Sequence, residues 1–319
     1  MIARACWFAI LLVAVAACDR PSERAGARFP DDASALGDVV DAAFSDGSTE
    51  DDPADLDEPP DASLSSGSFK VLTYNVAGLP QGISSSNPIE FMPLISPLLD
   101  DFDLVVVQED FWYHAQLIAE IHFPYTSMPW KEKPVITDIG DGLNRFSRSP
   151  FRDHTRIAWP GCNGQFDCAS DCLATKGFSV ARHTLAPGVE VDVYNLHMEA
   201  GGCAQDVVIR GQSIELLLQT LLERSAGMAV IMAGDFNLHQ ENEVDLTQLQ
   251  HLIDAAGLSD SCWSTNCGKT LIDRILVRSS STVELTTSGW NVPKTFVSAD
   301  GTDLSDHKPV SATVHWRRL

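Results

Sequence analysis

Apolar and polar positions divide the chain after residue 68 into short apolar runs and longer amphipathic segments. Short apolar runs bounded by polar residues are typical of buried β-strands. Such runs cover residues 69–74, 104–107, 228–233 and 271–277. Two more, at residues 177–182 and 189–194, flank Ala186-Pro187-Gly188 and predict a β-hairpin.

The longer segments show the spacing of amphipathic helices. Residues 208–223 carry a stripe of isoleucine and leucine at helical intervals, which predicts a helix with one buried face. Helices are also predicted over residues 89–99 and 112–121. Because a hairpin is mixed with crossover helices, we expect residues 69–319 to form one α/β (α+β) domain of two packed mixed β-sheets with helices outside.

The first residues are typical of an export signal. Arg4 supplies a positive charge, and residues 5–17 form an apolar run that is too short to cross a bilayer. Val15-Ala16-Ala17-Cys18 resembles a bacterial lipobox, in which the cysteine is acylated and becomes the mature N-terminus. We interpret residues 1–18 as a lipoprotein-type signal peptide ending at Cys18. It predicts an exported protein, anchored through lipid in a membrane of the bacterial cell envelope or surface; an ordinary secretory signal would instead predict a secreted protein.

Residues 19–68 have the composition of a disordered linker. No basic residue occurs between Arg28 and Lys70, whereas acidic, small and proline residues are frequent there. Such a segment cannot bury enough apolar surface to offset its ordering entropy. The whole chain has 22 Lys and Arg against 44 Asp and Glu, a net charge of −22. This balance argues against a protein that binds nucleic acid through a basic surface.

Polar side chains able to bind a metal ion or a phosphate occur at the ends of the predicted strands. A single residue of this kind is more often a turn former or a helix cap. Several of them at strand ends would be held rigidly at one edge of a sheet, which indicates a site. They are Asn75, Glu109, His197, Asp235, Asn237, Asp273, Asp306 and His307.

The segments around these residues resemble, in chain order, the motifs of the endonuclease/exonuclease/phosphatase superfamily. Each motif alone is weak, but the ordered set is specific and spans the whole predicted domain. The segments are Thr73-Tyr74-Asn75-Val76, Val107-Gln108-Glu109, Gly142-Leu143 through Ser147-Arg148-Ser149-Pro150, Asn195-Leu196-His197, Gly234-Asp235-Phe236-Asn237, Ile272-Asp273-Arg274-Ile275 and Ser305-Asp306-His307.

The resemblance implies a four-layered α/β sandwich that hydrolyses phosphoester bonds with a divalent cation, usually Mg²⁺. A phosphodiester is anionic, so a hard cation with oxygen ligands is needed to neutralise the charge that develops during attack. By the family pattern Glu109 is the principal metal ligand, with Asn75 beside it. Asp306 completes the metal shell directly or through water.

The same resemblance implies catalytic roles for the remaining strand-end residues. His307 faces the phosphoryl group, and Asp273 orients its imidazole. Asp235 and Asn237 position the attacking water and a non-bridging oxygen, and His197 contacts the phosphate or assists the leaving group. Either His307 or Asp235 accepts the proton of the water, and we favour His307.

The cysteines outside the leader predict three disulfides, because an even number in an exported chain usually forms a disulfide framework. They are Cys162, Cys168, Cys172, Cys203, Cys262 and Cys267. Cys262 and Cys267 are close enough to close a small loop, and the cluster at 162–172 is expected to reach Cys203. A zinc site is the alternative, but no Cys-x-x-Cys spacing occurs.

Several segments are similar to bacterial sphingomyelinases and favour a choline- or ethanolamine-type phospholipid, such as sphingomyelin, as the substrate. They are Glu109-Asp110-Phe111 with Phe123-Pro124-Tyr125 downstream, and Cys168 with Lys176-Gly177-Phe178, His197-Met198-Glu199-Ala200 and Cys203. Two features differ from that branch. Asp273-Arg274 resembles the nuclease and phosphatase branches, and no clear aromatic membrane-inserting hairpin is found.

Three alternatives therefore stay open: a secreted endo- or exonuclease, an inositol-polyphosphate phosphatase, and a lipid-tethered binding module without catalysis. The acidic charge argues mildly against the nuclease. Suitable residues at every family position argue against the binding module. We expect a monomer whose partners are a phosphoester substrate and a membrane, with no stable nucleic-acid partner.

Overall fold

The computed structural model describes residues 64–131, 134–135, 139–164 and 171–319. The predicted signal peptide, its Cys18, nearly all of the linker and Cys168 lie outside these residues, so those interpretations stay predictions. The first strand begins at Ser66, three residues before the start that we predicted for the domain. None of the helices in the described part of the chain combines the length and the apolar character that a bilayer span requires.

The first sheet has six strands in the spatial order β11-β12-β1-β2-β4-β3. They are β1 (Ser66–Asn75), β2 (Leu104–Gln108), β3 (Tyr125–Thr126), β4 (Asn144–Ser147), β11 (Val283–Asn291) and β12 (Val310–Arg318). β1 pairs in parallel with β2 and antiparallel with β12, so it lies in the centre of a mixed sheet. β2 is buried along its whole length, which explains its unbroken apolar run.

The second sheet also has six strands, in the order β5-β6-β7-β8-β10-β9. They are β5 (Phe151–Ala158), β6 (Gly177–Ala186), β7 (Val189–His197), β8 (Ala229–Asp235), β9 (Ser259–Asp260) and β10 (Asp273–Arg278). β6 and β7 form the predicted hairpin, and β7 pairs in parallel with β8 across a helical crossover. The predicted strands are confirmed, and their registers decide which side chains meet.

The helices differ from the predictions in three places. They are α1 (Pro88–Ile95), the 3₁₀ helix η1 (Ser96–Asp101), α2 (His114–Leu117), the 3₁₀ helix η2 (Asp171–Leu173), α3 (Ala204–Arg224), α4 (Glu243–Ala256) and α5 (Ser261–Ser264). The helix expected over 89–99 changes to 3₁₀ geometry at Ser96, next to Pro97, which has no N–H to donate. The helix expected over 112–121 is a single turn. α4 was not predicted, although Asn242 caps its first turn and Gly257 ends it at φ 63°.

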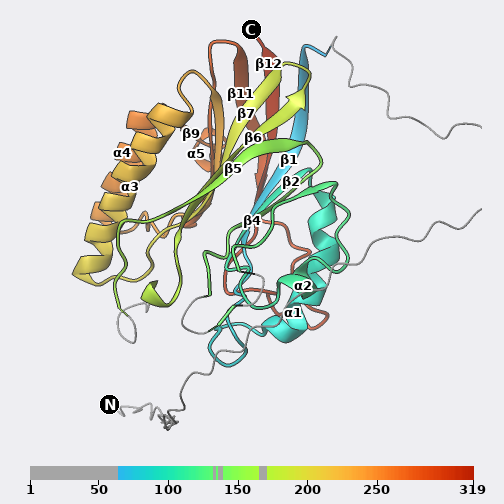
Figure 1. Cartoon of the computed structure of the whole chain (residues 1–319), viewed down its shortest axis with the longest axis vertical. Coiled ribbons are helices and arrows are strands. Elements are labelled where there is room, and N and C mark those ends of the chain that lie inside the picture. The colour runs from blue at the N-terminus through green and yellow to red at the C-terminus, as the bar shows by residue number, and fades with distance from the viewer. Residues whose placement is uncertain (1–63, 132–133, 136–138, 165–170) are drawn as a thin grey trace, which may run out of the picture. The chain divides into compact units, whose positions relative to one another are not determined.

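Three apolar cores hold four layers together, as the family resemblance implied (Figure 1). The central core lies between the two sheets and includes Val71, Val106 and Ile231. A second core packs α3 and α4 against the outer face of the second sheet. A third packs α1, η1 and α2 against the outer face of the first sheet. The arrangement is an α/β sandwich, and it brings the ends of strands from both sheets to one edge.

A guanidinium group that has no carboxylate partner among the described residues lies buried between the sheets. Arg145 on β4 is fully buried, and it donates to the carbonyl of Val193 at 3.0 Å and to the hydroxyl of Ser179 at 2.8 Å. It also donates to Nε2 of His183, at 3.4 Å. Because that nitrogen must accept, His183 is neutral here. Burial, followed by the charge of Arg145, lowers the pKa of His183 well below its usual range.

We therefore expect His183 to make the fold less stable at acid pH. The unfolded state binds a proton on this histidine below about pH 6.5, whereas the folded state does not, so the free energy of unfolding falls as pH drops below that value by up to ~1.4 kcal/mol per pH unit. His183→Gln should flatten this dependence. Denaturant unfolding of both proteins between pH 7.5 and 4.5 measures it, with exposed His251→Gln as the control. Equal pH slopes for wild type and His183→Gln would contradict the assignment.

Candidate active site

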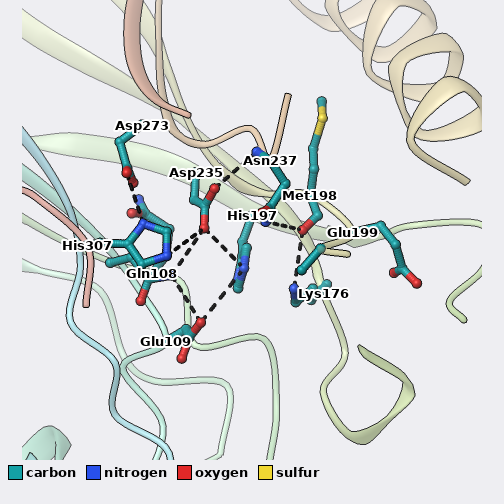
Figure 2. A network of polar contacts seen from close by, with 12 residues as sticks. Gln108, Glu109, Lys176, His197, Met198, Glu199, Asp235, Asn237, Asp273 and His307 are labelled. Carbon is teal, nitrogen blue, oxygen red and sulfur yellow. Dashed lines mark hydrogen bonds and ion pairs between the residues drawn. The ribbon is translucent and has the colours of Figure 1, made fainter. Parts of the chain in front are cut away.

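The registers of five strands bring the polar strand-end residues together. His197 ends β7 and is the pairing partner of Asp235, which ends β8. Asp273 begins the antiparallel strand β10 and pairs with the same Asp235. In the first sheet, Asn75 ends β1 opposite Gln108, directly before Glu109. Both sheets therefore end in polar side chains at the same edge (Figure 2).

The backbone at or next to the strand ends is unusual at three residues, Gly234, Glu109 and Asn237. A Cβ on Gly234 would lie 2.1 Å from the carbonyl oxygen of Leu196, so only glycine allows β8 to approach β7 before Asp235. Glu109 and Asn237 have φ values of 57° and 48°, in the left-handed region that a non-glycine residue rarely occupies. Asparagine tolerates this region better than glutamate does. Strain of this kind concentrates at functional sites, since the surrounding fold must hold it in place.

Two carboxylates from different sheets converge on one amide. Nδ2 of Asn75 donates to Oε1 of Glu109 at 3.0 Å and to Oδ2 of Asp235 at 3.1 Å. Its Oδ1 accepts from the backbone N–H of Ala77 at 3.1 Å, so the amide orientation is set by the loop that follows β1. Burial raises the pKa of Glu109, and Asn75 counters this effect. The predicted pair of Asn75 and Glu109 is thus brought together, with Asp235 as a third member.

The predicted pair of His307 and Asp273 is also brought together. Nδ1 of His307 lies 2.9 Å from Oδ2 of Asp273, and its Nε2 lies 3.7 Å from Oδ2 of Asp235. Burial lowers the pKa of His307, but Asp235 and Asp273 outweigh it and raise the pKa to about 10. Burial raises the pKa of Asp273 to about 6, partly offset by His307. In the protein alone, His307 is therefore a cation at neutral pH.

His197 faces the same carboxylate from the other side. Its Nε2 lies 3.4 Å from Oδ2 of Asp235 and 4.0 Å from Oε1 of Glu109 (Figure 2). Burial lowers the pKa of His197 well below its usual range, and Lys176 adds to this effect. Nδ1 of His197 has no hydrogen-bond partner among the described residues. The two imidazoles thus flank Asp235, one neutral and one charged.

Asp235 and Asn237 hold each other in a tight turn. The N–H of Asn237 donates to Oδ1 of Asp235 at 3.0 Å, and its Nδ2 donates to the carbonyl of Met198 at 3.0 Å. Burial raises the pKa of Asp235, but His307, His197 and Lys176 outweigh it and lower the pKa below its usual value. Asp235 is therefore a carboxylate at neutral pH and can receive a proton or a cation.

The donor set fits a hard divalent cation. The carboxylate and imidazole atoms of Asp235, Asp273 and His307 lie within 4.8 Å of one another. Oδ1 of Asp273 is buried without a hydrogen-bond partner among the described residues, and Glu109 adds a second carboxylate beside Asn75. Mg²⁺ binds oxygen ligands of this kind. Of the predicted metal set, Asn75 and Glu109 lie together at the site, whereas Asp306 is exposed and accepts a hydrogen bond from the hydroxyl of Ser85.

A cavity of about 400 Å³ opens over these residues. Its polar part consists of Glu109, His197, Asp235, Asn237, His307, Lys176 and Asp171. Its apolar part consists of Leu79, Ile83, Phe111, Ile139, Leu173, Ala174 and Ala200. Larger hollows on the surface do not contain the strand-end residues. The cavity can therefore take an anionic group at its polar part and an aliphatic group beside it.

Lys176 and Asp171 belong to the cavity but were not among the predicted site residues. Nζ of Lys176 lies 2.6 Å from Oδ1 of Asp171 and 3.3 Å from the carbonyl of Met198. The lysine is buried at the start of the hairpin and supplies a positive charge next to His197 and Asp235. Its place in the sphingomyelinase-like segment was the one signal that could have indicated it.

Arg274, which distinguished this chain from the sphingomyelinase pattern, does not line the cavity. Its Nη1 donates to Oδ2 of Asp260 at 2.7 Å, and its guanidinium lies over the ring of Trp263. Oδ1 of Asp260 accepts from the N–H groups of Cys262 and Trp263 and caps α5. Arg274 is thus part of the support for α5, whereas Asp273 before it contacts His307 in the site.

Two of the expected disulfides are described. Cys262 pairs with Cys267, as the short spacing predicted. Cys162 pairs with Cys172 across the loop that precedes the hairpin. Cys203 is disulfide-bonded as well. The remaining cysteine, Cys168, lies outside the described residues. The Cys162–Cys172 bridge fixes the segment that carries Asp171 next to the cavity.

Comparison of the chain with known proteins identifies its family. A model of the endonuclease/exonuclease/phosphatase family matches residues 72–307, which include every strand-end residue described above. The chain belongs to this family. Sphingomyelinases of Mycobacterium bovis and Mycobacterium tuberculosis are each 32% identical to it over 277 residues. The match covers 79% of this chain and 53% of each sphingomyelinase, so the chain spans about half the length of the curated relatives it matches.

Solved structures of the family share the fold. Sphingomyelinase C from Streptomyces griseocarneus superposes with a TM-score of 0.55 at 20% identity, covering 77% of this chain and 99% of that one. A beta toxin mutant from Staphylococcus aureus with bound magnesium ions gives a TM-score of 0.55 at 16% identity, covering 77% and 99%. At these identities the likeness establishes the fold alone, and the sandwich of two six-stranded sheets agrees with it.

Proposed function

We propose that the protein is a divalent-metal-dependent phosphodiesterase that acts on sphingomyelin or a related phospholipid. The observation that supports this substrate is the 32% identity to the mycobacterial sphingomyelinases over most of the described domain. Hydrolysis would break the phosphorus–oxygen bond to the lipid, giving ceramide and phosphocholine from sphingomyelin.

The cavity offers each group that this reaction needs. Glu109 and Asn75 would hold the divalent cation, which when bound would neutralise charge on the phosphoryl oxygens. The imidazole of His307, oriented by Asp273, can donate to a non-bridging oxygen. Asn237 fixes Asp235, and Lys176 contributes positive charge. Intact residues at these positions support an enzyme rather than a binding module.

Asp235 and His307 are the two candidates for accepting the proton of the attacking water. Asp235 is ionised and lies between the two imidazoles, which suits a proton acceptor. In the protein alone, His307 is protonated, which suits a hydrogen-bond donor to the phosphate. We therefore propose Asp235 as the base and His307 as the donor, in place of the base role that we favoured for His307 from the sequence.

The apolar part of the cavity supports a lipid over a nucleic acid or an inositol phosphate. Ile83, Ile139 and Leu173 line the same cavity as the carboxylates, and a polar substrate would gain little from contact with them. The net charge of −22 repels polyanions at low ionic strength, whereas a zwitterionic phosphocholine group has no net charge to repel.

A panel of substrates tests the proposal. The purified full chain is offered sphingomyelin vesicles, supercoiled plasmid and soluble inositol phosphates in parallel, each with Mg²⁺ and with a chelator. We expect phosphocholine release from the vesicles, and loss of the activity with the chelator. Plasmid nicking without phosphocholine release would make the protein a nuclease, and full activity in the chelated sample would contradict metal dependence.

A further inference from the structure

The loop 79–87, between β1 and α1, lines the cavity with two side chains and contacts the residue next to His307 with a third. Leu79 and Ile83 line the apolar part of the cavity. The side chain of Ile83 is 53% exposed, so it lies at the entrance with one face toward the cavity and the other toward solvent. A single exposed isoleucine is common on protein surfaces. This one is distinguished by its position on the wall of a cavity whose polar part carries the reacting groups.

The base of this loop is attached to the segment that carries Glu109. The N–H of Gly78 donates to the carbonyl of Glu109 at 3.0 Å, and a Cβ on Gly78 would lie 2.3 Å from that oxygen. The N–H of Gln81 donates to the phenol oxygen of Tyr113 at 2.8 Å. The loop is therefore held close to the proposed metal ligand, and its Leu79 and Ile83 line the cavity.

The other end of the loop contacts the residue next to His307. The hydroxyl of Ser85 donates to Oδ2 of Asp306, and the hydroxyl of Ser305 lies 3.3 Å from Oδ1 of the same carboxylate. Asp306 is exposed, so without these hydroxyls its side chain would be free to rotate into solvent. One residue, Ser84, thus separates the apolar contact of Ile83 from the polar contact of Ser85.

We propose that the loop 79–87 makes the enzyme selective for phosphodiesters with an apolar tail, with Ile83 contacting the tail and Ser85 positioning Asp306 beside His307. This inference rests on the proposed function and deepens it. Contact between an aliphatic chain and Ile83 removes apolar surface from water, and a soluble diester lacks that gain. Ile139 and Leu173 also line the cavity, so the tail can contact them as well and the selectivity is shared among these side chains.

Two diesters with the same headgroup test the role of Ile83: sphingomyelin in phosphatidylcholine vesicles, and soluble p-nitrophenylphosphocholine. The measured quantity is the ratio of kcat/KM for the lipid to kcat/KM for the soluble diester, using the full chain. Ile83→Ser should lower this ratio about tenfold, since loss of one aliphatic contact in a binding site changes specificity by roughly that factor. Ile89→Ser is the matched control, because Ile89 is 58% exposed and lies outside the cavity.

The outcomes separate this inference from the proposed function. An unchanged ratio in Ile83→Ser, or an equal change in Ile89→Ser, contradicts the inference while leaving the phosphodiesterase in place. A wild-type protein that hydrolyses neither phosphocholine diester contradicts both. Melting temperatures of the two variants within a degree of wild type are the check on folding.

The positioning role of Ser85 is tested by measuring the effects of substitutions on kcat and on KM separately. Ser85→Ala should lower kcat for both diesters by a similar factor, with KM unchanged, because Asp306 acts beside the reacting groups rather than on the tail. Ser85→Thr keeps the hydroxyl and should restore kcat. Ser86→Ala is the control, since the hydroxyl of Ser86 donates to the carbonyl of Leu304, at 3.5 Å, and does not contact Asp306 among the described hydrogen bonds. A rise in KM with kcat unchanged in Ser85→Ala would overturn the positioning role.

Discussion

Glu109→Gln is expected to lower phosphodiester turnover by a factor of roughly 10² or more, with little change in stability. The substitution keeps the size of the side chain and removes its charge. In the wild type this carboxylate shares the Nδ2 of Asn75 with Asp235, so both sheets contribute negative charge at one point. Without Glu109 the charge that would hold a divalent cation is reduced, and the phosphoryl oxygens lose neutralisation.

Two measurements check this expectation. Steady-state kinetics on p-nitrophenylphosphocholine gives the loss of kcat, and isothermal titration with Mg²⁺ gives the loss of affinity, which does not depend on turnover. Glu120→Gln, an exposed glutamate after α2, is the matched control. If Glu109→Gln bound Mg²⁺ as tightly as wild type and kept its activity, the metal site would have to lie elsewhere.

His307→Ala is expected to lower turnover by a similar factor of roughly 10² or more, and Asp273→Asn by less. Asp273 contacts His307 through Nδ1 at 2.9 Å, so its role is to orient the ring and to stabilise its charge. Asparagine can still accept a hydrogen bond there, but it removes the negative charge that helps to keep His307 protonated. Asp273→Asn should therefore lower the pKa of His307, so that kcat begins to fall at a lower pH on the alkaline side of its pH profile.

A double-mutant cycle distinguishes an Asp273 that acts through His307 from an Asp273 that contributes to catalysis independently. The double variant should be no slower than His307→Ala alone, because Asp273 acts through the histidine. Asp303→Asn, an exposed aspartate paired with Lys308, is the control. Additive losses in the double variant, or a wild-type pH profile for Asp273→Asn, would show that Asp273 contributes directly, for example as a ligand of the cation.

The sequence by itself determined six of the twelve strands, the hairpin and the two-sheet class of the fold, and it named most of the residues that the structure brings together at the candidate site. This was possible because buried strands have unbroken apolar runs, and because Asn75, Glu109, His197, Asp235 and Asp273 each stand at a strand end. Local pattern and chain order carry that information. The same locality explains the errors: α2 is one turn long because tertiary packing overrides a weak helical pattern, and Pro97 ends the α-helical geometry of the segment before it.

Only the tertiary structure decided which side chains meet across large separations in the chain. Asn75 bonds Asp235 over 160 residues, and Ser85 bonds Asp306 over 221 residues, and neither contact has a local signature. Likewise, only the structure shows that Arg274 bonds Asp260 and that Lys176 lines the cavity. These contacts depend on strand register and on the packing of one sheet against the other, which a pattern of residue types along the chain does not encode.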